Sequence, residues 1–201
     1  MYITARTITF SVLASLLLFA CGSSPQVRYF SLSPVATKAG SDPENSVVLG
    51  LGPLRIPEYL NRSQIVTRGI GAELQIDEFS RWAEPLDPSI HRALSVDVDR
   101  LLDGVVVVAF PYEAMIRSHV DYRLVGEILR FDSDAAGRIV LETQWVISSV
   151  DAEVIVHGQR SRYEARASSA GDPGAIAEAM NQALAKFSRD IAGKLEAGLQ
   201  E

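Results

Sequence analysis

The sequence predicts an α/β protein of the α+β type, in which a mostly antiparallel or mixed β-sheet has two main helices packed on it. Several segments between residues 120 and 166 alternate apolar and polar side chains as strands do, and two other segments repeat apolar residues every three or four positions as helices do. The composition, 47% hydrophobic and 22% charged residues, is ordinary for a globular domain, and 201 residues are enough to bury one core.

The amino-terminal segment has the layout of a secretory signal. Arg6 is the only charged residue of residues 1–20, and it precedes an apolar run of about a dozen residues, shorter than the ~20 that a membrane-spanning helix needs. Cys21, the only cysteine, stands where this run stops. The segment LFACG at residues 18–22 resembles the lipobox of bacterial lipoproteins, in which leucine and a small residue precede the lipidated cysteine. We therefore predict a signal peptide at residues 1–20, acyl chains on Cys21 and a short tether at residues 21–27.

The alternative is that Cys21 is an ordinary cysteine of an ordinary signal peptide. Gly22 follows it, in place of the aspartate that commonly retains such lipoproteins at the inner membrane. The resemblance therefore implies the periplasmic face of the outer membrane, where several acyl chains hold a protein far more firmly than one chain does.

Four short strands are predicted before the first helix. They are residues 28–32, 47–56, 64–68 and 73–77, which are rich in apolar, β-branched or aromatic residues and are bounded by turn-forming residues. Gly50 and Gly52 lie inside the second strand, which predicts a bend or a close backbone approach there.

The first predicted helix begins at Asp87 and Pro88, an acid suited to the N-cap and a proline suited to the first helical position. Gly104 suits the end of this helix. The continuous apolar run at residues 105–110 then predicts a strand that is buried on both faces in the middle of the sheet. The apolar face of the helix is predicted to consist of Ile90, Leu94, Val98 and Leu101.

Three long strands are predicted at residues 120–132, 139–150 and 153–166, joined by turns short enough for antiparallel hairpins. In the middle strand every second residue from 139 to 147 shares one face, opposite Glu142. One face of this sheet should therefore pack on the core, and the other should meet water.

The last predicted helix begins at Asp172 and Pro173 and runs to about Leu199. Its apolar residues fall three or four apart and form one stripe, which is predicted to cover the sheet. The stripe consists of Ile176, Met180, Leu184, Phe187, Ile191, Leu195 and Leu199.

Composition and spacing argue against catalysis, metal binding and nucleic-acid binding. The formal net charge is −6, whereas nonspecific nucleic-acid binding depends on lysines and arginines that neutralise phosphates. His91, His119 and His157 are far apart and have no metal-binding spacing, and a single cysteine excludes an internal disulfide. We predict no catalytic residues, no metal site and no cofactor, and hence a protein that is not an enzyme.

Arg160, Arg162 and Arg166 lie at even spacing in the last long strand and so share one face. A basic strip on an acidic protein could bind lipid phosphates or an acidic partner. The alternative is a solvated face whose arginines pair with nearby acids.

Four stretches resemble the PqiC-type family of ABC-transport auxiliary lipoproteins: YFSLSP at residues 29–34, GPLRIPEYLNRSQIVTR at 52–68, EFSRWAEPL at 78–86 and ALAKFSRDI at 183–191. The lipidated cysteine of that family corresponds to Cys21. The resemblance implies a periplasmic domain at residues 28–201 that works with an MCE-type periplasmic protein and inner-membrane transport components to move lipids between the membranes. The domain would dock the conduit at the outer membrane, a task that a homo-oligomer would suit.

The same resemblance singles out Tyr59, Arg62 and Trp82, which would either touch a partner or hold the fold. The alternative function is a periplasmic lipoprotein that binds a small ligand or assists the assembly of another envelope complex. A large apolar pocket and a monomeric state would favour the ligand-binding alternative.

Overall fold

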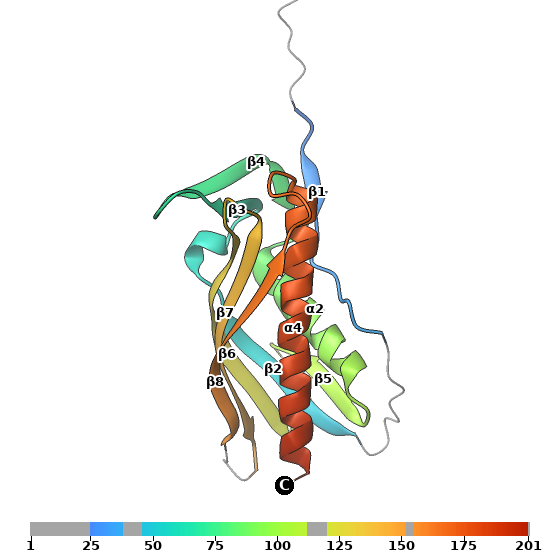
Figure 1. Cartoon of the computed structure of the whole chain (residues 1–201). Coiled ribbons are helices and arrows are strands. Elements are labelled where there is room, and N and C mark those ends of the chain that lie inside the picture. The colour runs from blue at the N-terminus through green and yellow to red at the C-terminus, as the bar shows by residue number, and fades with distance from the viewer. Residues whose placement is uncertain (1–24, 38–45, 112–119, 152–154, 201) are drawn as a thin grey trace, which may run out of the picture.

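Eight strands form one mixed sheet, and two helices pack on one of its faces (Figure 1), so the predicted α+β fold is confirmed. The computed structural model describes residues 25–37, 46–111, 120–151 and 155–200, and the predicted signal peptide, Cys21 and His119 lie outside these ranges. The strands are β1 (Arg28–Phe30), β2 (Val47–Arg55), β3 (Gln64–Arg68), β4 (Leu74–Trp82), β5 (Val105–Ala109), β6 (Tyr122–Ser133), β7 (Arg138–Ser149) and β8 (Ile155–Arg166). The helices are α2 (Leu86–Leu101), α4 (Pro173–Leu199) and the short 3-10 helix η3 (Glu58–Leu60).

Strand β6 is shared by two branches of the sheet. On one edge it pairs with β7 in antiparallel orientation, and β7 pairs likewise with β8, which confirms the two predicted hairpins. On the other edge the first part of β6 pairs with β2, whereas its last residue, Ser133, pairs with Thr67 of β3. The sheet continues beyond β2 with β5, and beyond β3 with β4 and β1.

The prediction that residues 105–110 form a strand in the middle of the sheet is wrong. β5 lies at the edge beyond β2 and pairs with no other strand in the described ranges. Helix α2 packs on β5, which accounts for one apolar face, while residues 106–108 are only half-buried. A short apolar run thus marks a strand without fixing its place in the sheet.

Helix α2 begins earlier than the sequence predicts. Its N-cap is Pro85, and Asp87 and Pro88 lie in the first turn, so the predicted capping role of Asp87 is wrong. Proline is tolerated there because the N–H groups of the first turn have no partner within the helix. The predicted start of α4 is confirmed, since the Asp172 carboxylate accepts a hydrogen bond of 3.1 Å from the Ala175 N–H.

The core lies between the two helices and the sheet face on which they pack, and α4 with β7 and β8 forms one part of it. Trp145 of β7 meets Phe187 of α4 edge-on with the ring centroids 5.6 Å apart, and Tyr163 of β8 stacks on Phe187 at 5.4 Å. The Tyr163 hydroxyl also donates to the Asp190 carboxylate at 2.6 Å, so one stretch of α4 makes both aromatic and polar contacts with the sheet. The residues predicted to form the buried face of β7 are all buried: Ile139, Leu141, Thr143, Trp145 and Ile147.

The segment at residues 28–36 contacts both helices. The Ser33 N–H donates to the Asn181 side chain of α4 at 3.0 Å. Asp97 of α2 accepts two backbone N–H groups of the same segment at 2.7 and 2.8 Å. Leu32 between them is fully buried. This segment is therefore fixed to the core and to both helices.

Gly52 forms the bend that the sequence predicts in β2. Its φ is +108°, a conformation that L side chains rarely adopt, and the register with β6 shifts between Leu51 and Leu54. A Cβ at this position would lie 2.8 Å from the Phe110 Cβ and 3.2 Å from the His91 ring. Both the backbone conformation and the available space therefore require glycine.

We predict that Gly52→Ala destabilises the domain more than Gly104→Ala does. Gly104 also has a positive φ, +70°, but a Cβ there would meet nothing within 4 Å, and its replacement should cost about 1–2 kcal/mol through backbone strain alone. The crowding at Gly52 adds roughly 1–3 kcal/mol. Urea unfolding of both variants and the wild type measures the difference, and equal losses would contradict it.

Candidate functional site

The sheet face that points away from the helices is rich in arginine, and we call it the outer face. In β7 the residues of the buried face point toward the helices, so the residues that alternate with them point to the outer face. Their cross-strand partners in β6 and β8 point to the outer face as well. Its charged members are Arg123, Glu127, Arg130, Asp132, Arg138, Glu142, Arg160, Arg162, Glu164 and Arg166. Arginines outnumber acids here although the whole chain carries a net charge of −6.

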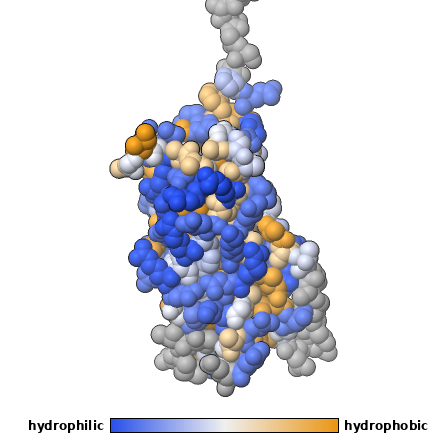
Figure 2. Space-filling model, in the orientation of Figure 1, coloured by the Kyte–Doolittle hydropathy of each residue, from blue (hydrophilic) through white to orange (hydrophobic). Residues whose placement is uncertain are grey.

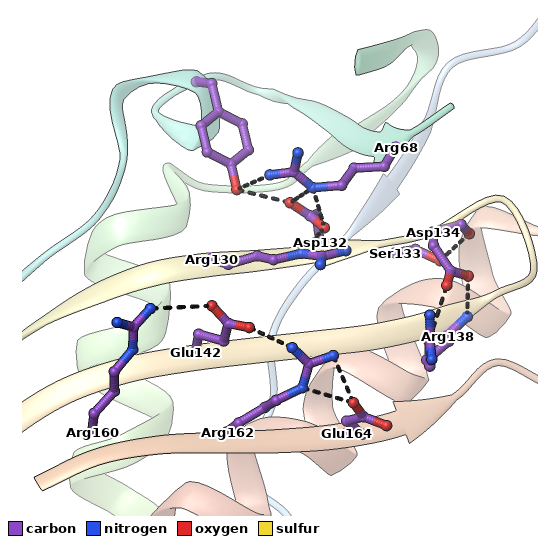
Figure 3. A network of polar contacts seen from close by, with 11 residues as sticks. Arg68, Arg130, Asp132, Ser133, Asp134, Arg138, Glu142, Arg160, Arg162 and Glu164 are labelled. Carbon is purple, nitrogen blue, oxygen red and sulfur yellow. Dashed lines mark hydrogen bonds and ion pairs between the residues drawn. The ribbon is translucent and has the colours of Figure 1, made fainter. Parts of the chain in front are cut away.

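Asp132 is fully buried at one end of the outer face, among donors from three elements (Figure 3). The Arg68 Nε of β3 donates to both carboxylate oxygens at 3.0 and 2.9 Å, and the Arg130 Nε of β6 donates to Oδ1 at 2.7 Å. The Tyr59 hydroxyl of η3 donates to Oδ2 at 2.8 Å. We call these four residues the Asp132 cluster. Its carboxylate has the charged and polar partners that a buried charge requires.

The Asp132 carboxylate contributes to a raised pKa of both Tyr59 and Arg68. Burial, together with the hydrogen bond to Asp132 and its charge, raises the pKa of Tyr59 to about 12. Burial opposes the charge of Arg68, but Asp132 and Tyr59 outweigh it and raise the pKa of Arg68. The Arg68 guanidinium also lies over the Tyr59 ring, 5.6 Å from its centroid. Near neutral pH Tyr59 therefore stays protonated and Arg68 stays charged, and both remain donors to Asp132.

The predicted strip of Arg160, Arg162 and Arg166 lies exposed on β8. Arg162 donates to Glu142 at 2.5 Å and to Glu164 at 2.8 Å, and Arg160 lies 3.8 Å from Glu142 (Figure 3). The hydrogen bond to Glu164 and the charges of both acids raise the pKa of Arg162. The Arg166 side chain forms no hydrogen bond or ion pair within the described part of the chain. Two of the three arginines are therefore paired with acids, and the third presents its charge to solvent.

The three residues singled out by the family resemblance lie in different surroundings. Trp82 is 5% exposed in the hydrophobic core, and Tyr59 belongs to the Asp132 cluster. Arg62 is exposed and lines a hollow of about 290 Å³ together with Glu84. Tyr59 and Trp82 therefore make contacts within the fold, Trp82 also lines the hollow, and the Arg62 side chain is exposed to solvent.

Arg68, Arg130 and Asp132 were not among the residues predicted for a site. The spacing of Arg130 and Asp132, two residues apart in a strand, was an available signal because it puts both side chains on one face. Tyr59 and Arg68 come from other elements, and no local pattern brings them to Asp132.

The described residues hold no group of three or more His, Cys, Asp or Glu side chains that could bind a metal ion. No helix within the same ranges is long and apolar enough to cross a membrane. His91 and His157 lie apart: the His91 Nε2 accepts the Leu54 N–H at 3.2 Å, and His157 packs against Trp145.

Two hollows of about 460 Å³ each open to solvent. One lies between the β3–β4 hairpin and the start of α4, with Thr67 and Ile176 in its lining. The other lies beside α2, with Val96 and Val107 in its lining.

A comparison with protein families decides the class of the protein. Residues 30–192 match the sequence model of the family described as the ABC-type transport auxiliary lipoprotein component. The chain belongs to this family. The resemblance to PqiC-type auxiliary lipoproteins is thereby confirmed. The Asp132 cluster and the arginine strip of this auxiliary lipoprotein both lie inside the matched residues.

Solved structures share the fold of the auxiliary lipoprotein. Protein XCC0632 from Xanthomonas campestris gives a TM-score of 0.68 at 20% identity, covering 87% of this chain and 97% of that chain. The crystal structure of an uncharacterized protein gives a TM-score of 0.69 at 19% identity, covering 85% of this chain and 99% of that chain. The hypothetical protein CT253 from Chlamydia trachomatis gives a TM-score of 0.50 at 9% identity, covering 76% of this chain and 99% of that chain. At these identities the likeness shows the fold alone. No curated protein sequence matches the chain.

We predict that Asp132→Asn destabilises the auxiliary lipoprotein by about 3 kcal/mol, because two guanidinium groups then face a neutral amide in a buried site. The control is Glu164→Gln, which removes an exposed ion pair with Arg162 and should cost about 0–1 kcal/mol. Urea unfolding of the two variants measures the difference. Similar losses in both would show that the Asp132 cluster does not hold the sheet together.

Proposed function

We propose that this auxiliary lipoprotein is anchored in the outer membrane through Cys21 and docks an MCE-type periplasmic conduit of an ABC transport system that moves lipids between the membranes. It acts by binding its partners and catalyses no reaction. The family match at residues 30–192 carries the proposal, because that family is described as an auxiliary lipoprotein component of ABC-type transport.

The geometry supports a domain that stands on a membrane. Cys21 precedes Pro25, the first described residue, by four positions, and four residues span at most about 14 Å. Helix α4 starts at the same end, where Arg28 and Asp172 form an ion pair of 3.1 Å. We call this the tether end; it is at the top of Figure 1. The 27 residues of α4 would project the domain about 40 Å into the periplasm.

The outer face supports an acidic partner. Both helices pack on the opposite side of the sheet, and the arginines of the outer face other than Arg130 are exposed. An excess of positive charge on one face of an acidic protein favours approach by a negatively charged surface from one direction. A homo-oligomeric ring would present this face several times around one conduit.

The first test compares the wild type with Cys21→Ala in cells. We expect acylated wild-type protein in the outer-membrane fraction, together with an MCE-type protein that co-purifies with it. The variant should lose the membrane fraction, because the protein then lacks its acyl chains. A wild type that is soluble and unacylated would refute the anchor. A wild type that is anchored but alone and monomeric would favour the ligand-binding alternative.

The second test concerns the arginine strip. Arg160→Gln, Arg162→Gln and Arg166→Gln together should weaken the capture of the MCE-type partner about tenfold, because each removes one charge from the docking face. The matched control changes three basic residues of α4 by the same charge: Lys186→Gln, Arg189→Gln and Lys194→Gln. Equal capture by the two triple variants would place the docking surface elsewhere.

A further inference from the structure

The tether end carries most of the exposed large apolar side chains in the described part of the chain. We call residues 64–82, which form β3, a turn and β4, the hairpin arm. Ile70 at the tip of the arm is 90% exposed. Figure 2 shows the tip as an orange patch that projects from the body. The other exposed apolar residues of this end are Leu74, Ile76 and Phe79 on the arm, and Val27 and Tyr29 on or next to β1, which pairs with β4.

The structure holds Ile70 away from the core. The Gly69 N–H donates to the Glu73 carbonyl at 3.0 Å and so closes the turn. Next to this turn, Arg68 at the end of β3 binds the buried Asp132 and so attaches the arm to the main sheet. Exposed apolar side chains that gather on one element are typical of a surface that binds a partner or a membrane.

The position of the patch identifies what covers it. Tyr29 is 65% exposed, and it follows Pro25 by four residues. Cys21 stands four residues further back, so the acyl chains and the apolar patch belong to the same end of the molecule. Strand β4 crosses this end of the molecule (Figure 1), so that the arm extends sideways from the tether. Given the anchoring proposed above, a bilayer surface is the partner that both features face.

We propose that the hairpin arm is a second membrane contact, which inserts Ile70 into the interfacial layer of the bilayer to which Cys21 is tethered. This inference rests on the proposed anchor. Interfacial segments bury apolar side chains about 5–10 Å deep at the headgroup boundary, where aromatic side chains such as Tyr29 and Phe79 also fit. Acids outnumber arginines on the arm, three to two, so a zwitterionic surface is preferred to an anionic one. Two separate contacts would fix the orientation of the domain on the membrane, whereas one anchoring point would not.

The test places tryptophan probes in the full acylated protein. Ile70→Trp reports the tip of the arm, and Leu199→Trp is the matched control, an exposed aliphatic position at the opposite end of α4. The proteins are reconstituted in vesicles of phosphatidylethanolamine with a minor share of phosphatidylglycerol, with and without brominated acyl chains. The native Trp82 and Trp145 are buried, and the wild type supplies their background signal.

We expect quenching by brominated lipid to be on the order of threefold stronger at position 70 than at position 199, because the control probe lies about 40 Å along the helix from the tether end. Equal quenching of the two probes would overturn the proposal. A blue-shifted emission at position 70 without quenching would also overturn it, because a second copy or another protein would then cover the arm.

Mass spectrometry of Cys21 in the same samples separates this inference from the anchor. If Cys21 is acylated and the position 70 probe is not quenched, the hairpin arm fails as a membrane contact while the anchor stands. If Cys21 is not acylated, the anchor fails, and the same two probes in Cys21→Ala protein are measured with added vesicles. Preferential quenching at position 70 would then support the arm on its own, and its absence would reject the arm as well.

Discussion

The buried carboxylate of Asp132 is the constraint on which the architecture of the tether end depends. A charge removed from water must be surrounded by donors, and this one is met by Arg68 from β3, Arg130 from β6 and Tyr59 from η3. The backbone pairing between β3 and β6 is limited to Thr67 with Ser133. The side chains around Asp132 therefore supply much of the attachment of one sheet branch to the other.

The elements that local sequence patterns describe were predicted well. The hairpins of β6, β7 and β8, the buried face of β7 and the capped start of α4 follow from alternation, short turns and an N-cap acid with its proline, all of which act within a few residues. The edge position of β5 and the division of one edge of β6 between β2 and β3 were not predictable. They depend on which strands, far apart in the sequence, pair with one another. The periodicity of a segment predicts a strand but does not predict its neighbours in the sheet.

The candidate site was likewise predictable only where a local sequence pattern describes it. Even spacing located the strip of arginines on β8, because strand alternation alone puts those side chains on one face. The resemblance drew attention to Tyr59 and Trp82, and the structure assigns both to contacts of the fold. The Asp132 cluster needs three elements to meet, and its members therefore had no common signal in the sequence. The family itself was recognisable because its segments are spread over most of the chain.

The attachment of residues 28–36 has a mechanical consequence. β1 runs parallel to β4, so tension applied at the amino terminus along the strand would load the hydrogen bonds of this pair in shear and would not peel them apart one at a time. Beyond the strand, Asn181 and Asp97 hold the same segment to α4 and α2. Force between a membrane and a periplasmic partner would thus enter the domain through β4 and both helices together.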